Sequence, residues 1–358
     1  MGNYIIKKIG NTCITLFGVV TVIFFLFHIL PGDPARMMLG QNEDAAQLKI
    51  VQQKYGFDQP VFTQYLYYLN DLSPLSFHSN NKEHYTYLSS KNYHHILLVK
   101  TQNKSFVLKT PYLRTSFTRQ GKNVSEILKD TLPNTIILAS TSITIALFLG
   151  VFLGIISALY KDRWIDKFVL IISTLGMSLP SFFSAIIFAW LFGFLWQEFT
   201  GLEMTGNLYE LDDYGEYRAL QFQNLILPSI VLGIRPLAVV SQLMRNSLLE
   251  VFNQEYIKTA KSKGLSAKQV LLKHALRNAM SPVVTAISGW FASLLAGAVF
   301  VEYVFGWNGL GKEIVNALNT LDLPVIMGAV LIIATTFVII NIVVDIIYAF
   351  LDPKIKLN

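Results

Sequence analysis

The chain has 358 residues, of which 53% are hydrophobic and 15% are charged, and its formal net charge is +6. Soluble domains carry about 25% charged residues, so this composition excludes a chain immersed mostly in water. The basic residues gather in particular loops and form no patch with interleaved aromatics, a distribution that is typical of membrane proteins and argues against a nucleic-acid partner.

The first apolar segment runs from about Ile9 to Leu30, long enough to cross a bilayer core of about 20 residues. Lys7 and Lys8 precede it, so a secretory signal peptide is the competing interpretation. Because Pro31-Gly32-Asp33-Pro34 follows it and no small-residue cleavage site does, we interpret it as a retained membrane helix. The single cysteine, Cys13, lies in this segment and is predicted to be a buried small hydrophobic residue, which excludes an intramolecular disulfide and a cysteine-based metal site.

About 100 residues separate this segment from the next, and a loop of that length is translocated whatever its charge. Phe62–Leu72 predicts one helix in the loop, and apolar residues at helical spacing predict another before it: Ala45, Leu48, Val51 and Tyr55. Ile96–Val99 and Phe106–Leu108 flank Thr101–Lys104 and predict a β-hairpin. We therefore expect a small extracellular α+β insert, and its role is left open for the part from about Pro74 to Thr110.

Four histidines lie in this loop: His78, His84, His94 and His95. Their spacing matches no metal-ligand pattern, and no cluster of carboxylates accompanies them. They are predicted to lie on the surface or to face a partner, with no metal bound.

Five further apolar segments are predicted to span the membrane: Thr135–Tyr160, Phe168–Trp196, Leu225–Leu243, Val283–Val301 and Pro324–Phe350. The fourth of the six spans is interrupted by Pro228, Arg235 and Pro236, and such breaks are tolerated where neighbours or a water-lined cavity satisfy the freed backbone groups. The fifth offers small residues for close helix packing: Gly289, Ala292, Ala296 and Gly297.

The short loops predict the orientation. Lys161, Arg163 and Lys167 follow the second span, and further basic residues crowd the segment between the fourth and fifth spans. The connector after the third span is acidic instead. Since positively charged loops stay in the cytoplasm, both termini are predicted to lie there, which agrees with the basic tail at Lys354 and Lys356.

The segment from Arg245 to Met280 is too polar to span the membrane and is predicted to form a helical hairpin. Its first helix is predicted to end at Gly264, and Ser266 is predicted to cap the second. Such a hairpin either docks into a groove of a cytoplasmic partner or lies on anionic lipid, and spacing alone leaves both open.

The sequence contains no hydrolytic triad, metal-ligand cluster or dinucleotide fingerprint, so no enzymatic activity and no cofactor are predicted. Gly306–Lys312 matches the spacing of a phosphate-binding loop, but Glu313 stands where Ser or Thr is needed, and a membrane helix precedes it where a strand should. Charges within the spans are few: His28, Arg235, Glu302 and Asp345. Without a chain of buried carboxylates, proton coupling is disfavoured and energy must come from elsewhere.

The hairpin resembles the "EAA" loop of ABC importer permeases, and in particular the B-type subunit of their oligopeptide/dipeptide/nickel branch. Five motifs carry the resemblance over nearly the whole chain: Pro31–Ala35; Tyr256–Gly264; His274–Asn278; Gly297–Gly311 with Glu302-Tyr303-Val304-Phe305 and Gly309-Leu310-Gly311; and Asp345 with Tyr348 and Asp352-Pro353. Lys258, Thr259 and Ala260 replace the general Glu-Ala-Ala, and His274–Arg277 replaces Ile-x-Leu-Pro. Both departures resemble the peptide branch.

The resemblance implies an all-α integral membrane protein of the bacterial cytoplasmic membrane, with the type I ABC importer permease fold. It divides the chain into an N-terminal membrane helix (1–31), the extracellular insert (32–131) and a core of five further spans (132–358) with a coupling loop (245–281). Implied partners are a second homologous permease, two cytoplasmic ATP-binding subunits, and an extracytoplasmic substrate-binding protein or lipoprotein that delivers peptide. ATP hydrolysis belongs to those subunits.

The same resemblance assigns coupling to the ATPases to one set of residues: Tyr256, Lys258, Thr259, Ala260, Gly264, His274, Arg277 and Asn278. Arg235, Glu302 and Asp345 are candidate pore or structural residues. Nickel or metal-chelate import is the alternative within the family. Alternatives from other classes are a proton-coupled secondary carrier and a membrane scaffold with an adhesion insert.

Overall fold

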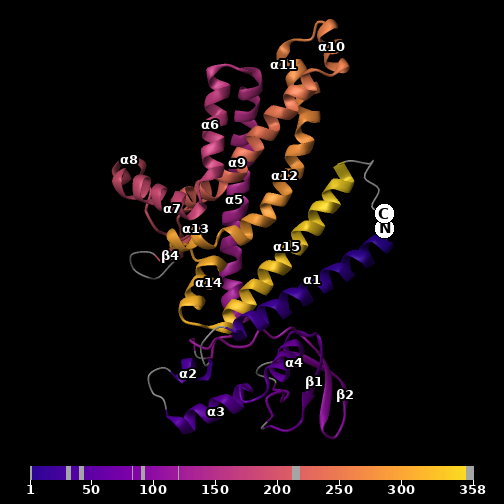
Figure 1. The fold of residues 1–358 in the computed structure, drawn as a ribbon, viewed down its shortest axis with the longest axis vertical. Helices are drawn as coiled ribbons and strands as arrows, with labels where there is room; N and C mark the ends of the chain where they lie inside the picture. The colour runs from indigo at the N-terminus through magenta and orange to yellow at the C-terminus, as the bar shows by residue number, and fades with distance from the viewer. Residues whose placement is uncertain are drawn as a thin grey trace. The chain divides into compact units, whose positions relative to one another are not determined.

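The computed structural model describes residues 2–29, 34–39, 44–82, 84–89, 93–119, 121–211 and 218–351 (Figure 1). Contacts divide the chain into two compact units. One, which we call the outer unit after the predicted extracellular position of its insert, consists of residues 1–131 and 313–335 with 357–358; the other, the core unit, consists of residues 132–312 with 336–356. Several motif residues, among them Pro31–Asp33 and Asp352-Pro353, lie outside the described residues, as do the side chains of Asp345 and Tyr348.

Long apolar helices confirm the predicted class of membrane protein. By length and composition five segments can cross a bilayer, within α1 (Gly2–Ile29), α5 (Val124–Leu159), α9 (Gln223–Phe252), the region of α12 (Leu276–Gly297) and α15 (Leu323–Leu351). One bent pair of helices brings the number to six if the pair is a single span. The described helices thus give five or six spans against the six predicted, and the third and fourth differ in form from the prediction.

The predicted third span is not one straight helix. It consists of α6 (Trp164–Ser178) and a second segment, α7 (Ser181–Trp190) with the π-helical η1 (Leu191–Leu195), and the two meet at 108°. The break falls at Leu179-Pro180, where Leu179 is extended (φ −78°, ψ 134°), as expected for a residue that precedes proline. The apolar run continues across the break, so hydropathy alone does not reveal it.

The predicted interruption of the fourth span was wrong, because α9 is continuous over 30 residues despite Pro228 and Pro236. It packs against α6, α7 and α12. It also lies against α5, where a side chain added at Gly150 would come within 2.9 Å of the Leu237 carbonyl oxygen, and one added at Gly154 would come within 2.6 Å of Met244. Close packing on several sides outweighs the backbone hydrogen bond that each proline removes.

The small residues expected to pack in the fifth span are only partly used within this chain. Ala292 is buried, whereas Gly289 and Ala296 are exposed, and nothing lies within 4 Å of a side chain added at Gly289. Close packing of two helices occurs instead between α5 and α9, at Gly150 and Gly154, which are four residues apart and share one face of α5.

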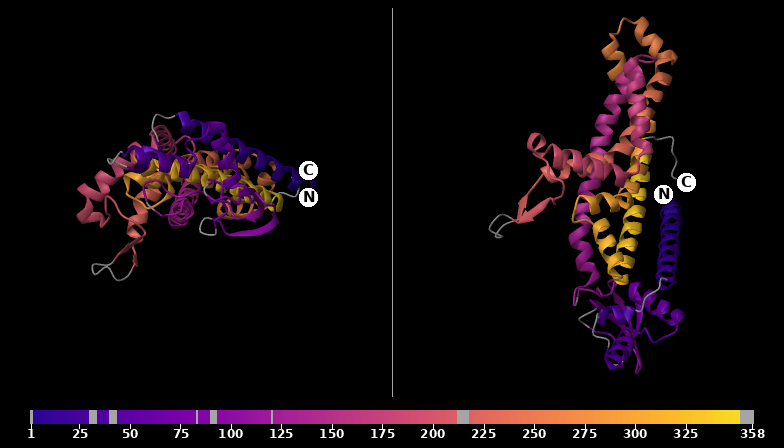
Figure 2. Two further views of the ribbon diagram at one scale, coloured as in Figure 1. Left: turned by 90° about the horizontal axis from the view of Figure 1, so that it is seen from below. Right: turned by 60° about the vertical axis from the view of Figure 1, so that its left-hand side comes forward.

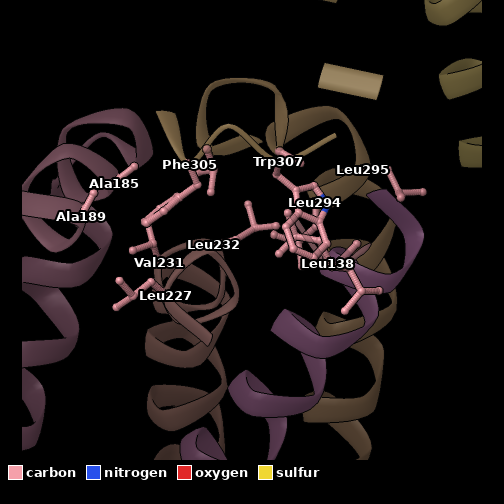
Figure 3. Close-up of a cluster of buried hydrophobic side chains, with 14 residues drawn as sticks. Leu138, Ala185, Ala189, Leu227, Val231, Leu232, Leu294, Leu295, Phe305 and Trp307 are labelled. Carbon is pink, nitrogen blue, oxygen red and sulfur yellow. The ribbon is translucent and has the colours of Figure 1, made fainter. Parts of the chain in front are cut away.

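The core unit is held together at one end of its helices by a cluster of apolar side chains (Figure 3). Leu138 comes from α5, Leu232 from α9 and Leu294 from α12. Trp307 is fully buried among them and donates from its indole nitrogen to the Asn134 carbonyl oxygen at 3.1 Å. This cluster fixes the position of α13 (Val299–Val304) and of the loop that follows it.

Between α7 and α9, the core unit carries α8 (Gln197–Thr200) and a hairpin of β4 (Tyr209–Leu211) and β5 (Arg218–Leu220), which project sideways from its helices (Figure 2). The strands are tied to the loop after α13. Gly206 donates to the Phe305 carbonyl at 3.0 Å, and Asn308 donates to the Asn207 side chain at 2.7 Å.

The outer unit contains the predicted α+β fold. After α2 (Pro34–Leu39) come α3 (Ala45–Tyr55), capped by Asp44 and closed by left-handed Gly56, and α4 (Val61–Leu72). The predicted hairpin is formed by β2 (His95–Lys100) and β3 (Lys104–Lys109). A strand that was not predicted, β1 (Leu75–Ser79), pairs with the other edge of β3, so the antiparallel sheet has the order β1-β3-β2.

Within the outer unit, the membrane helix and the start of α15 are attached by specific contacts. Phe24 of α1 is fully buried and stacks on Tyr68 of α4, with ring centroids 5.7 Å apart. Asp322, two per cent exposed, precedes α15 and accepts hydrogen bonds from the Phe117 backbone at 3.0 Å and the Thr118 hydroxyl at 2.8 Å. Arg119 pairs with Glu313 of α14 (Leu310–Asn319) at 2.7 Å.

Two predictions about single side chains were wrong. Cys13 is exposed on the surface of α1 and is not buried in this chain. His78 is buried beside the sheet, where its ring nitrogens lie 2.9 Å from the Ser76 hydroxyl and 3.0 Å from the Thr86 carbonyl. Burial lowers the pKa of His78 and favours its neutral form. Among the described residues, no group of His, Cys, Asp and Glu could hold a metal ion.

Candidate functional site

The helical hairpin predicted from the sequence is present and stands at the tip of α9 and α12 in the core unit (Figure 1). It consists of α10 (Glu255–Ser262), a turn, α11 (Ala267–Gln269) and the π-helical η2 (Val270–Ala275), which continues into α12. The hairpin therefore connects α9 directly to α12, so a displacement of the hairpin would move both helices.

Gly264 makes the turn, as predicted. Its φ of 79° is left-handed, a conformation that costs other residues about 1–2 kcal/mol. The amide of Gly264 donates to the Lys261 carbonyl at 2.9 Å, and that of Leu265 donates to the Ala260 carbonyl at 3.4 Å. These two bonds form a Schellman motif, which satisfies the last carbonyls of α10 and reverses the chain.

Ser266 caps the second half of the hairpin, again as predicted. Its hydroxyl accepts from the Gln269 amide at 3.4 Å, while the Gln269 side chain accepts from the Ser266 amide at 3.0 Å. This reciprocal capping box, next to the Schellman motif, fixes both sides of the turn at Gly264.

Buried side chains fasten the hairpin to the core unit. Ile257 and Ala260 of α10 are buried with Val270 and Ala275 of η2, against Leu248 of α9. The side chain of Asn278 donates to the Tyr256 hydroxyl at 2.7 Å and ties the start of α12 to α10. The hairpin is thus a rigid extension of the helices that carry it.

The opposite face of the hairpin is exposed and strongly basic. Six cations are exposed between Asn253 and Asn278: Lys258, Lys261, Lys263, Lys268, Lys273 and Arg277. The only acidic residue in this stretch is Glu255, which pairs with Lys258 at 2.7 Å. Both partners are exposed, so this pair adds little stability. The face suits a partner surface that carries carboxylates.

The other residues assigned to coupling lie on both sides of this arrangement. Thr259 is exposed, and its hydroxyl donates to the Glu255 carbonyl at 3.0 Å. His274 is partly buried in η2, whereas Arg277 is exposed one turn later. Buried Ala260 supports the hairpin from within, so the motif combines an anchor with an outward surface.

A buried ion pair that the sequence analysis did not predict braces the base of the hairpin. Arg245 of α9 donates to both oxygens of Asp166 of α6, each at 2.7 Å. Ser157 of α5 donates to the same carboxylate, and so does the Asp162 amide at 2.9 Å. Three membrane helices are therefore fixed together ten residues before α10 begins.

Two of the candidate pore or structural residues have clear positions. Arg235 is exposed on α9 and donates weakly to the Met177 carbonyl, at 3.4 Å, beside the break between α6 and α7. Glu302 is fully buried in α13 and accepts from the amides of Gly311 at 2.6 Å and Lys312 at 3.3 Å, so it caps α14. The side chain of Asp345 lies outside the described residues.

The loop from Gly306 to Lys312 has a structural role. Helix α13 precedes it, and no strand does. The Lys312 ammonium donates to the Gly306 carbonyl at 2.8 Å, and a side chain on Gly309 would overlap the Glu302 carboxylate. Gly309 and Gly311 are thus required because the backbone passes close to the buried Glu302 carboxylate. This packing explains why the glycine spacing matches that of a phosphate-binding loop.

Comparison with known proteins identifies the family. A family model described as "Binding-protein-dependent transport system inner membrane component" matches residues 150–357, and the corresponding N-terminal model matches residues 1–85. The chain belongs to this family of ABC importer permeases. The predicted resemblance is therefore confirmed, and the chain is a permease subunit and not itself an enzyme.

Relatives within the permease family match the chain from end to end. It is 34% identical over 356 residues to the glutathione transport system permease protein GsiC of Shigella flexneri serotype 5b, covering 99% of both chains. It is 33% identical to GsiC of Escherichia coli strain K12, with the same coverage.

A solved structure supports the fold. A chain of the inward-facing MetNI methionine ABC transporter aligns with a TM-score of 0.51 at 15% identity, covering 64% of this permease and 97% of that chain. The type I permease fold predicted for the chain is thereby confirmed.

Proposed function

We propose that this permease is one half of the pore of an ATP-driven importer of short peptides. In this proposal a second homologous permease completes the pore, two ATP-binding subunits bind on the cytoplasmic side, and an extracytoplasmic binding protein or lipoprotein delivers the cargo. The observation that carries it is the hairpin at Gly264, which is anchored to α9 and α12 by its buried face and presents its basic face outward.

The hairpin gives a direct route for energy. ATP binding would draw the two ATP-binding subunits together, and each would move the hairpin of the permease on which it sits. Because the buried side chains and the Arg245–Asp166 pair fix this hairpin to three helices, the helices would move as a body between inward- and outward-open states. Tyr256, Lys258 and Thr259 would form the contact from α10, and His274, Arg277 and Asn278 from the second half.

The proposed orientation places the hairpin and both termini in the cytoplasm and the insert of residues 32–131 outside the membrane. Positively charged short loops support this topology. Arg235 supports a location of the pore beside α9, since an exposed cation in the middle of a membrane helix needs water or a partner next to it. We assign Arg235 to the pore or to the interface with the second permease.

The proposed cargo class rests on the peptide-branch motifs and on the relatives. GsiC is a glutathione permease, and glutathione is a small peptide. The binding protein would make most of the selection, because it meets the cargo first. The permease would need only a water-lined path wide enough for short peptides.

Transport by the reconstituted complex tests this proposal. The permease and its partners in proteoliposomes should take up radiolabelled glutathione or a tripeptide only when ATP is supplied on the side of the ATP-binding subunits, and a protonophore should not stop the uptake. Uptake that persists without ATP and collapses with the protonophore would establish a proton-coupled carrier instead. Uptake of nickel but of no peptide would overturn the cargo class.

A further inference from the structure

The outer unit contains a cavity of about 720 Å³ whose described lining residues all belong to that unit. Aromatic side chains form much of its wall, chiefly Tyr55, Phe57, Tyr85, Tyr87, Tyr93 and Tyr112. Its volume falls within the range of about 300–1,000 Å³ that is usual for small-molecule sites. Its described lining residues include neither Arg235 nor any residue of the hairpin, so the proposed function does not account for it.

The charged residues among the described lining residues of the cavity are all basic. Lys54 of α3, Lys82 from the segment after β1 and Arg114 all contribute to the lining, and none of the described lining residues is Asp or Glu. Lys54 and Lys82 are exposed. No carboxylate among the described residues forms an ion pair with either lysine, so within the described part of the chain neither ammonium group has an acidic partner.

Arg114 provides the third cation, from a more buried position. Its Nε donates to Asp71 at 2.9 Å, and its guanidinium lies over the rings of Tyr68 and Tyr85, with centroid distances of 5.0 and 5.5 Å. Asp71 also accepts from the hydroxyls of Tyr85 at 2.9 Å and Tyr93 at 3.0 Å, which occupies both of its oxygens. These contacts fix the plane of the guanidinium.

The terminal nitrogens of Arg114 are not used by this network. Among the described residues, only its Nε is hydrogen-bonded, and the residue itself lines the cavity. Arg114 has a left-handed backbone, with φ of 67°, which costs a non-glycine residue about 1–2 kcal/mol. Arg114 thus lines the cavity with its plane fixed, and its planar fork of donors is the group that pairs with a carboxylate through two parallel hydrogen bonds.

We propose that this cavity binds a short peptide through a carboxylate group. The carboxylate pairs with Arg114 and with the lysines at the rim, while the tyrosine and phenylalanine rings pack against the peptide planes and side chains. The site adds a peptide-binding position on the extracellular part of the chain, distinct from the pore. It depends neither on ATP nor on the partners of the proposed importer.

Equilibrium binding to the purified full-length chain tests the site without transport. The probes are the tripeptide Ala-Ala-Glu and its C-terminally amidated counterpart Ala-Ala-Gln amide, which carries no carboxylate, measured by calorimetry at two salt concentrations. The acidic peptide should bind at least about tenfold more tightly than the amide, equivalent to about 1.4 kcal/mol, and salt should weaken its binding. Equal binding of the two peptides would overturn the proposal.

Variants then locate the binding. Lys54→Gln with Lys82→Gln changes exposed side chains only and should weaken binding of Ala-Ala-Glu about tenfold while leaving the melting temperature unchanged. The matched control is Lys104→Gln, an exposed lysine on β3 that does not line the cavity, and it should bind normally. Binding that is unchanged in the double variant would place the peptide elsewhere, for example in the pore, and refute the site.

Discussion

Replacing Arg245 with methionine will destabilise the folded chain by about 3–5 kcal/mol. The substitution leaves the Asp166 carboxylate, two per cent exposed, with its charge in a buried site and without its cation. Removal of one partner of a buried ion pair typically has this cost, because the remaining charge is desolvated and uncompensated. Thermal unfolding of the purified variant in detergent will measure the loss.

Two controls separate the ion pair from a general effect of losing an arginine. Arg163→Met removes an exposed arginine three residues before Asp166 and should change stability by less than about 1 kcal/mol. The double variant Arg245→Met with Asp166→Leu should recover most of the lost stability, since a pair of apolar side chains has no charge to desolvate. A double variant as unstable as Arg245→Met would mean that packing, and not the pair, is decisive.

The second large effect is expected at Gly311, for which Gly311→Ala should destabilise the chain by about 3 kcal/mol. An added side chain would overlap the Cα of Val299 and come within 2.9 Å of the Glu302 carboxylate oxygen. Backbone atoms cannot move aside as a flexible side chain does, so α13 and α14 must separate. Overpacking typically costs about 1–3 kcal/mol, and here it also disturbs the hydrogen bonds that Glu302 accepts.

Gly289→Ala is the matched control for Gly311→Ala. Nothing lies within 4 Å of a side chain added at Gly289, which is in the middle of α12. Alanine favours a helix over glycine by up to about 1 kcal/mol, so this variant should unfold at the same or a higher temperature. If Gly311→Ala unfolds like Gly289→Ala, the close packing of α13 on α14 is wrong.

Local signals were sufficient for the helices and for the turn of the hairpin. Hydropathy placed the spans, and Gly264 and Ser266 marked the turn because one favours a left-handed end and the other caps a helix. The form of the spans required tertiary information. Pro180 accompanies a bend of 108°, whereas Pro236 lies in a continuous helix, and the difference depends on the neighbours of each helix.

Two features of the structure could not be predicted from the sequence. One is a contact between distant residues, and the other is a strand whose burial pattern is the reverse of the usual one. Asp166 and Arg245 are 79 residues apart, and nothing local to either residue indicates the other. Strand β1 directs Ser76 and His78 inward and leaves Leu75 and Phe77 exposed, the reverse of the usual apolar-inward alternation. Its buried polar side chains are stabilised by hydrogen bonds that become visible only once the sheet is assembled.

The buried ion pair and the hairpin together make one mechanical unit. Ser157 near the end of α5, Asp166 near the start of α6 and Arg245 in the last third of α9 hold these helices together ten residues before α10 begins. The hairpin then continues into α12 through η2. A force applied to the hairpin would therefore reach at least four helices at once, which a flexible cytoplasmic loop would not achieve.

The proposed docking of the hairpin on ATP-binding subunits is tested most directly by capture of those subunits with the tagged permease. Gly264→Val imposes strain on the left-handed turn without altering any charge, whereas asparagine tolerates that conformation. We predict that Gly264→Val, folded and inserted in the membrane, captures about tenfold less of the ATP-binding subunits than Gly264→Asn or the unaltered chain. Equal capture by the valine variant would contradict docking through this hairpin.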